Sequence, residues 1–461
     1  MAMGEVREIP DEGHEQLIER VAAIDVAKAF GKICTRVPAA TGTGRRLTRV
    51  WEVSATANAV LELADDLIGQ GIEKVTVEST GDYWRIWFYL LEARGLNIQL
   101  VNAREVKHLP GRPKTDTLDA VWLAKLTEKG LVRPSFVPPA QVRALRDYTR
   151  LRIDLSHERT RHWQRLEKLL EDALIKLSVV VSKLTTASAR DMIEALIAGQ
   201  RDPRVLAELA QGRLRRKNEA LIEALTGQFD DHHAELAAML LAQIDGLDTH
   251  IMRLTGRIEE LVATLPGPAG TANPAGDGGP DGGPDGAPGG SGGSGGPAPV
   301  TAVERLDEIP GISPQIAQVI IAEIGLDMTR FATAAHLVSW AKLCPRTIQS
   351  GTRSRGGATG KSNPYLKGVL GIAATAAAKS DTFLGARYRR IVKRRGKLKA
   401  LVAVARSILV IVWHLLADSQ ARYHDLGADY HSRTLDRDRK TRSHVRQLQA
   451  LGFTVTLTPT A

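Results

Sequence analysis

Short apolar runs alternate with amphipathic stretches over the first part of the chain. Residues 21–26, 32–37 and 47–53 are rich in β-branched and other apolar side chains, which predicts a three-stranded meander. The pattern then predicts a helix at 57–68, a strand at 74–78, a helix at 83–93, a strand at 97–101 and a helix at 115–129. Three strands followed by alternating helices and strands indicate a mixed α/β sheet.

The stretch from 141 to 265 carries no strand signal. Its apolar residues recur at spacings of mostly three and four, as Leu236, Leu240, Ile244, Leu247, Ile251, Leu254, Ile258, Leu261 and Leu265. This repeat predicts a coiled coil or a long helical hairpin. Antiparallel packing against residues 151–177 of the same chain and dimerisation would both satisfy it. One long helix on a globular core is the simpler alternative.

A compositional break separates the two halves of the chain. Residues 266–299 are almost entirely Gly, Pro, Ala, Asp and Ser, which cannot bury enough apolar surface to offset their ordering entropy and therefore predict a disordered linker. The predicted domains are an α/β domain at 20–139, a helical coiled-coil region at 140–265, this linker, a mainly helical domain at 300–420 and a basic tail at 421–461.

The charge balance favours a polyanionic partner. The 461 residues contain 62 Lys and Arg against 52 Asp and Glu, a formal net charge of +10. Lys and Arg neutralise phosphates and release counterions, so nucleic acid is the natural partner, although many basic proteins bind none.

Three sequence features indicate where the protein acts. Cys34 and Cys344 are too few and too far apart for a disulfide framework, so we expect a reducing, cytoplasmic location. The polar N-terminus lacks the apolar stretch of a signal peptide. The most apolar segment, 405–417, is short for a membrane span and carries Arg406 and His414, which predicts a buried helix and no membrane partner.

Four acidic residues stand where a two-metal site would need them. Asp25 lies inside the first apolar strand, Glu78 closes a later strand, and Asp116 and Asp119 are three apart at the start of a helix, which places them on one face. Carboxylates from separate elements can hold two Mg²⁺ ions about 4 Å apart for phosphodiester cleavage.

Each acid also has a simpler interpretation. Asp116 could complement the helix dipole, Glu78 could cap a turn, and Asp25 could pair with Lys28. Singly, the simpler interpretation is favoured for Asp116 and is about even for the others. Jointly, the four acids favour a metal site.

At this point the sequence resembles a known family. The segments AIDVAK, VESTGDYW, NAREVKHLPGRPKTDTLDAVWLAKL and PSFVPP resemble the RuvC-type DEDD domain of one insertion-sequence transposase family, whose members are also called bridge-RNA-guided recombinases. The resemblance implies an RNase H-like fold, dependence on Mg²⁺ (with Mn²⁺ as an alternative) and action on double-stranded DNA. Its four acids correspond to Asp25, Glu78, Asp116 and Asp119. One departure is Ala23, where a Gly often precedes the Ile-Asp pair.

The segment after the linker predicts a helix, a tight turn at Pro310 and Gly311, and a second helix. This pattern resembles a helix-hairpin-helix element, whose turn N–H groups can contact a DNA phosphate. An αα-hairpin that only packs is equally consistent with the pattern.

Residues 345–363 form a polar stretch that predicts a long functional loop. Arg353, Arg355 and Lys361 follow Ser350 and could bind a scissile phosphate, as could Lys114 in the first domain. By composition Ser350 is an ordinary turn serine. Residues 306–378, however, are similar to the C-terminal domain of the same family, which implies that Ser350 is the nucleophile. Ser354 and Ser362 are the alternatives, and Tyr365 would serve in tyrosine-type chemistry.

A dense basic run follows, at residues 386–399. Such a single-sign cluster repels itself unless an anion faces it, which favours contact between nucleic acid and Arg390, Arg394 and Arg395.

The resemblance implies a transposase that cuts and rejoins double-stranded DNA, a structured guide RNA from the element, and dimers that pair into a tetramer. Two rival functions remain at this point. One is a Holliday-junction nuclease that uses metal-activated water, and the other is a non-catalytic DNA-binding protein.

Overall fold

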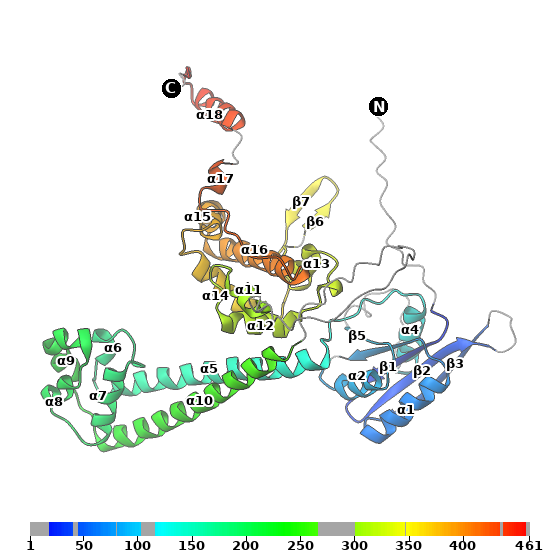
Figure 1. The fold of residues 1–461 in the computed structure, drawn as a ribbon, viewed down its shortest axis with the longest axis horizontal. Coiled ribbons are helices and arrows are strands. Elements are labelled where there is room, and N and C mark those ends of the chain that lie inside the picture. The colour runs from blue at the N-terminus through cyan, green and yellow to red at the C-terminus, as the bar shows by residue number, and fades with distance from the viewer. Residues whose placement is uncertain are drawn as a thin grey trace, which may run out of the picture. The chain divides into compact units, whose positions relative to one another are not determined.

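The computed structural model describes residues 18–39, 45–79, 81–102, 116–265, 300–345, 347–433 and 437–457. The chain divides into two compact units, Met1–Val137 and Pro138–Ala461 (Figure 1). The predicted linker at 266–299 and the candidate Lys114 lie outside the described residues.

The first unit is built on a five-stranded mixed sheet. Its order is β3-β2-β1-β4-β5, with β1–β2 and β2–β3 antiparallel and with β1–β4 and β4–β5 parallel. The strands are β1 (Val21–Val26), β2 (Phe30–Pro38), β3 (Arg46–Ser54), β4 (Lys74–Ser79) and β5 (Ile98–Asn102). The predicted meander and mixed sheet are confirmed.

Helices cover both faces of this sheet (Figure 1). Helices α1 (Ala57–Gly69) and α2 (Trp84–Ala93) pack on one face, in a core that includes Ile24, Val77 and Trp87. Helix α4 (Asp116–Glu128) covers the other face, where Val21, Ala23 and Cys34 meet Ala120, Leu123 and Ala124. Because side chains alternate along a strand, Asp25 belongs to the α4 face.

Two long helices begin the second unit and lie side by side in Figure 1, as an arm. They are α5 (Ala140–Asp172) and α10 (Asp231–Ala263). The apolar repeat is therefore satisfied inside one chain, by the helical-hairpin alternative. One position was predicted wrongly: Leu236 is 46% exposed, because Ala237 and Leu241 face the core at that end instead.

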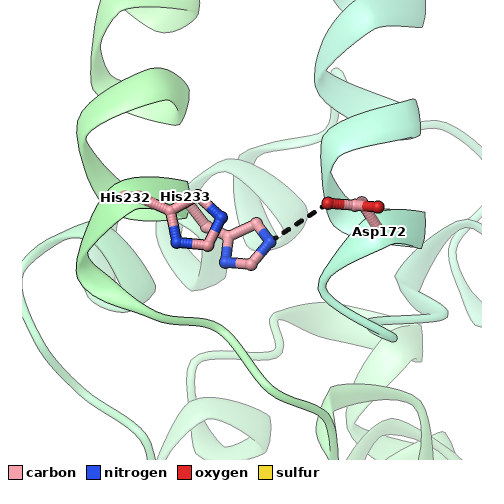
Figure 2. A group of neighbouring side chains, drawn as sticks. All are labelled: Asp172, His232 and His233. Atoms are coloured by element: carbon pink, nitrogen blue, oxygen red, sulfur yellow. Dashed lines mark ion pairs between the residues drawn. The ribbon is translucent and has the colours of Figure 1, made fainter.

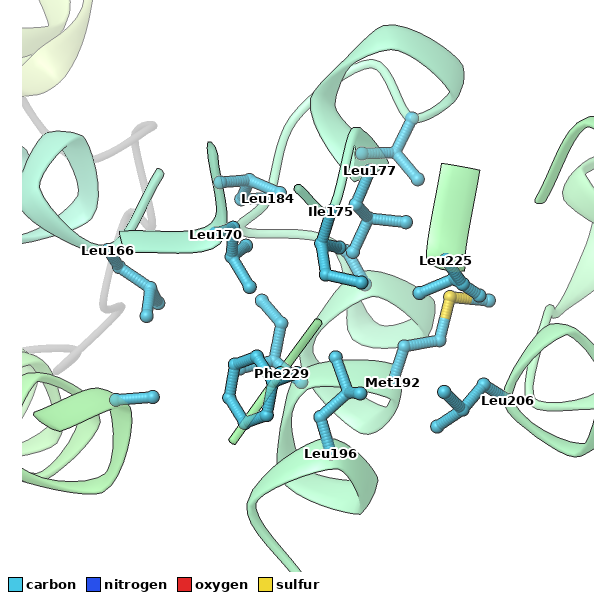
Figure 3. Close-up of a cluster of buried hydrophobic side chains, with 14 of the residues drawn as sticks. Leu166, Leu170, Ile175, Leu177, Leu184, Met192, Leu196, Leu206, Leu225 and Phe229 are labelled. Atoms are coloured by element: carbon cyan, nitrogen blue, oxygen red, sulfur yellow. The ribbon is translucent and has the colours of Figure 1, made fainter. Parts of the chain in front are cut away.

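A cluster of short helices joins the distal ends of the arm. They are α6 (Leu177–Val180), α7 (Ala187–Ile197), α8 (Pro203–Glu208), the 3-10 helix η1 (Gly212–Lys217) and α9 (Asn218–Leu225). Figure 3 shows their core, in which Leu166 and Leu170 of α5 pack with Met192 of α7 and Phe229. Burying large apolar side chains stabilises this end of the arm.

The rest of the second unit is mainly helical. Its elements are α11 (Ala302–Asp307), α12 (Pro314–Ile324), the 3-10 helix η2 (Met328–Arg330), α13 (Ala334–Trp340), β6 (Thr347–Ser350), β7 (Arg353–Gly356), α14 (Pro364–Ala377), α15 (Phe383–Arg395), α16 (Lys397–Ala417), α17 (Tyr430–Arg433) and α18 (Arg437–Ala450). Among the described residues, α16 alone is long and apolar enough to cross a membrane. It buries Val404, Ile408 and Val412 and packs on α13, α14 and α15, as expected for a core helix.

The polar stretch at 345–363 differs from the predicted loop, because it contains a two-stranded antiparallel hairpin, β6–β7. Gly351 stands in the turn at φ +57°, a conformation that favours glycine. The hairpin was missed because Ile348 is the one apolar residue of its strands, so no alternation marks it.

Helices α11 and α12 flank the predicted turn at Pro310 and Gly311. Gly311 adopts φ +92°, and a Cβ there would lie 2.3 Å from the carbonyl oxygen of Ala373 in α14. Glycine is thus required for close packing on α14. A DNA contact at Gly311 stays a prediction.

Candidate functional site

Strand register brings two of the candidate acids together. Asp25 and Glu78 are direct partners across the parallel strands β1 and β4, at the carboxyl end of each strand. Register partners on neighbouring strands point to the same face of a sheet, and here that face is covered by α4. Glu78 is only 5% exposed, so its carboxylate lies in a largely desolvated place.

The direction of α4 places the other two acids at the same edge. Near the end of α4, Thr127 Oγ1 bonds Thr76 Oγ1 at 2.7 Å, two residues before Glu78. The last residue, Glu128, receives bonds from Arg36 at 2.8 Å and Arg46 at 2.9 Å, beside the start of β1. Helix α4 therefore runs back along the sheet and begins toward the strand ends that carry Asp25 and Glu78.

Asp116 opens α4 and Asp119 follows one turn later, half-buried. The side chain of Asp116 lies outside the described residues. Three elements thus bring acidic residues to one edge of the sheet. Carboxylate oxygens from separate elements are the donor set that Mg²⁺ and Mn²⁺ prefer, so the residues fit a divalent cation.

The thiol in the first unit is not a nucleophile candidate. Cys34 is buried in β2, and this burial raises its pKa to about 12. The thiolate is the reactive form of cysteine, so Cys34 is inert at neutral pH.

In the second unit Ser350 lies at the end of β6, opposite Arg353 across the hairpin. Register places Ile348, Arg353 and Arg355 on one face of the hairpin. Arg353, Arg355 and Lys361 are exposed, as an anion-binding role requires. The side chains of Ser350 and Ser354 lie outside the described residues.

Two of the alternative nucleophiles have structural partners. Ser362 Oγ donates to the carbonyl of Ala341 at 2.7 Å. Tyr365 donates its hydroxyl to Asp154, with oxygen distances of 3.0 and 3.1 Å, and burial together with this bond raises the pKa of Tyr365. The first contact ties Ser362 to the backbone of Ala341, and the second ties Tyr365 to α5.

The predicted basic surface forms around α15. Arg390, Arg394 and Arg395 are exposed, and Arg390 Nη2 lies 3.5 Å from His431 Nε2 of α17. Burial, followed by the charges of Arg390 and Arg387, lowers the pKa of His431. The charges repel one another here, which favours an anion as partner.

One polar cluster was missed from the sequence. Asp172, His232 and His233 have ligand atoms within 4.8 Å of one another at the distal end of the arm (Figure 2). His233 Nδ1 accepts the backbone N–H of Asp230 at 3.2 Å, so the proton of the neutral ring is on Nε2, 3.5 Å from Asp172. A metal at Nε2 would have to displace that proton, so the geometry favours a helix cap whose Nε2–H faces the Asp172 carboxylate. In the sequence, the signal that could have revealed this cluster is the capping box that Asp230 and His233 form at the start of α10.

An acid-edged α/β unit joined to a basic helical unit is typical of proteins that act on nucleic acids. Comparison with known families gives two matches: residues 22–175 match the model DEDD_Tnp_IS110, described as a transposase, and residues 303–389 match the transposase IS116/IS110/IS902 family. With one match in each half, two regions of the chain are similar to transposases of the IS110 family.

A curated relative is similar to part of the chain. The chain is 35% identical over 116 residues to the insertion element IS110 uncharacterized 43.6 kDa protein of Streptomyces coelicolor. The aligned part covers 24% of this chain and 28% of that relative, well under two thirds of its length.

Proposed function

We propose that this protein is a recombinase that cuts and rejoins double-stranded DNA to excise and insert a mobile element. The observation that carries the proposal is the register pairing of Asp25 with Glu78 at one edge of the sheet. Helix α4, which carries Asp116 and Asp119, begins near that edge. The region lies within the residues that match a transposase family. The first unit has the mixed sheet expected of an RNase H-like fold.

In this proposal Asp25, Glu78, Asp116 and Asp119 hold divalent cations, Mg²⁺ or Mn²⁺. The metal supplies positive charge that stabilises the phosphorane-like transition state and lowers the pKa of a nearby hydroxyl. The desolvated position of Glu78 strengthens its attraction for a cation.

Ser350 supplies the nucleophile. Its oxygen attacks the scissile phosphorus, a serine–phosphate bond forms, and the bond from phosphorus to one deoxyribose oxygen breaks. The hydroxyl proton leaves the serine, and the released deoxyribose oxygen takes up a proton. Attack of a different deoxyribose hydroxyl on the phosphoserine reverses these changes and joins new strands without an external energy source.

The basic groups would hold the nucleic acid. Arg353, Arg355 and Lys361 lie on or after the hairpin, and Arg390, Arg394 and Arg395 extend the surface along α15. Lys114 and Gly311 complete the proposed contacts. In this proposal a structured guide RNA pairs with the DNA and gives sequence specificity, and dimers or tetramers bring both catalytic groups to one phosphate.

The decisive experiment is recombination of a donor and a target plasmid with Mg²⁺ and the element's noncoding RNA. Ser350→Ala should abolish both recombination and the covalent protein–DNA adduct on a denaturing gel, whereas the neighbouring Ser354→Ala should retain them. Cleavage by Ser350→Ala without an adduct would support the metal-activated-water nuclease. DNA binding without cleavage by the wild type, unchanged in Asp25→Asn and in the presence of chelator, would support a non-catalytic binding protein.

A further inference from the structure

A fully buried carboxylate lies at the base of the arm. Glu323, near the end of α12, has no solvent exposure. Arg150 of α5 donates to both of its oxygens, Nε to Oε1 at 2.7 Å and Nη2 to Oε2 at 2.9 Å, and Arg146 Nε lies 3.4 Å from Oε2. A buried charge is costly unless it is paired and fully hydrogen-bonded, and Glu323 has both kinds of partner.

The α5 residues of this network share one helix face. Arg146, Arg150 and Asp154 are spaced by four, which aligns them along the helix. Arg146 also donates to the carbonyls of Ala322 (3.0 Å) and Glu323 (2.7 Å), which are among the last carbonyls of α12. Such terminal carbonyls have no partner within their helix, so the arm caps α12.

The same face contacts the start of α14. The Arg150 guanidinium lies 4.8 Å from the centre of the Tyr365 ring, whose hydroxyl donates to Asp154. These contacts connect α5 with the residues that directly follow the serine-bearing segment.

Asn363 closes the network with both ends of its amide. Its oxygen accepts the N–H groups of Tyr365 at 3.0 Å and Leu366 at 3.3 Å, which caps α14. Its nitrogen donates to Glu323 Oε2 at 2.5 Å. Asn363 thus ends the hairpin segment and fastens that end to a carboxylate that the arm also holds.

We propose that Glu323, Arg150 and Asn363 are positioning residues that couple the arm to the hairpin carrying Ser350. The inference rests on the proposed function, because it concerns placement of its nucleophile. A shift of α5 moves Arg150, and the bidentate bond transmits that shift through Glu323 to Asn363. The arm thereby sets where the segment 347–363 stands.

An exchange of the amide and the carboxylate tests this coupling. Asn363→Asp keeps an N-cap for α14 but places a carboxylate against Glu323, so the link breaks while the cap persists. We expect adduct formation to slow by about tenfold or more, because small misplacements of reacting groups are costly. Adding Glu323→Gln to Asn363→Asp restores an amide–carboxylate pair and keeps the Arg150 Nε bond to Oε1, but it loses the Nη2 bond, so it should recover part of the rate.

A matched control separates coupling from simple stability. Asp245→Asn breaks another bidentate pair of this unit, with Arg190 at 2.9 and 2.7 Å, far from α14 in sequence. It should leave the adduct rate within about twofold, since exposed pairs contribute little. DNA affinity and the midpoint temperature of thermal unfolding are measured for every variant. If Asn363 had only a structural role, Asn363→Asp would lower the unfolding midpoint, and adding Glu323→Gln would not recover the adduct rate.

Amide hydrogen exchange in the absence of DNA gives a readout independent of the chemistry. Asn363→Asp should accelerate exchange across 347–363, and the double variant should slow it again. Unchanged exchange, or a double variant no better than the single one, would overturn the coupling. If the wild-type protein forms no adduct but the exchange pattern appears, the proposed function fails and the coupling stands.

Discussion

The two units hold their candidate groups by different means. In the first unit Asp25 and Glu78 are fixed by backbone pairing between β1 and β4, inside a sheet with helices on both faces. In the second unit Ser350 lies on a two-stranded hairpin without a core of its own, and its segment is anchored at Asn363 by side-chain bonds.

This difference predicts different sensitivities. Backbone pairing is insensitive to most single side-chain changes. The edge of the sheet with Asp25 and Glu78, here called the acidic edge, should therefore lose activity only when one of its acids is replaced. A small two-stranded hairpin is marginal alone, so the serine should respond to residues that never approach the DNA. In the proposed function the acids would form a pre-organised site, whereas the serine would depend on the rest of its unit for its position.

The largest effect should come from the acidic edge itself. Glu78→Gln preserves shape and strand pairing but removes a charged ligand, so DNA cleavage should fall by at least about 100-fold with little change in DNA affinity. Cleavage assays and filter binding on the same substrate measure the two quantities. Asp65→Asn, at an exposed pair with Arg94 on the α1–α2 face of the sheet, is the matched control and should behave as wild type. Equal loss in both variants would mean that charge near the sheet matters, and not this edge.

The sequence predicted the first unit well, because its buried strands show either continuous apolar residues or alternating apolar and polar residues. Strand β1, for example, begins and ends as predicted. Asp25 was found because an acid is out of place in such a strand. The sequence could not predict the β6–β7 hairpin, whose pairing comes from backbone bonds between polar residues. The Glu323 network was equally hidden, because Arg150 and Glu323 are separated by 173 positions and each reads as an ordinary surface charge.

The exposed position of Leu236 in α10 is the other difference between prediction and structure. The repeat in α10 correctly indicated a packed helix, but Leu236 points outward because the short helices around Phe229 and His233 redirect the core. The spacing of apolar residues in the sequence predicts which face of a helix is buried. It does not show where along the helix the packing partner changes.

A smaller effect, on stability, distinguishes the units directly. Gly31→Ala puts a Cβ 2.8 Å from the Trp87 ring in the first unit, and Gly311→Ala puts one 2.3 Å from the Ala373 carbonyl in the second. Each should cost about 1–3 kcal/mol of unfolding free energy through overpacking. Gly311→Ala should be worse, because its obstacle is backbone and its φ of +92° is strained for alanine.

Denaturant unfolding followed by hydrogen exchange assigns each loss to its unit. Gly371→Ala is the control, because a Cβ there meets nothing within 4 Å in the helix α14. It should stabilise the second unit by about 0.5–1 kcal/mol through helix propensity. If Gly311→Ala destabilised the first unit equally, the two units would not be separate in folding.

The smallest expected effect concerns pH at the basic surface of the second unit. Without nucleic acid the pKa of His431 lies below its ordinary 6.5, through burial and the charges of Arg390 and Arg387. Phosphates bound there would offset those charges and raise the pKa, so binding takes up a proton. DNA affinity should therefore be independent of pH above about 7.5 and tighten as the pH falls through 6.5. The gain should stay below about tenfold, the limit for a pKa rise of one unit. Titration of affinity against pH at constant salt measures it, and His431→Gln should flatten the curve while His414→Gln should not. A flat wild-type curve would place the nucleic acid away from α15 and α17.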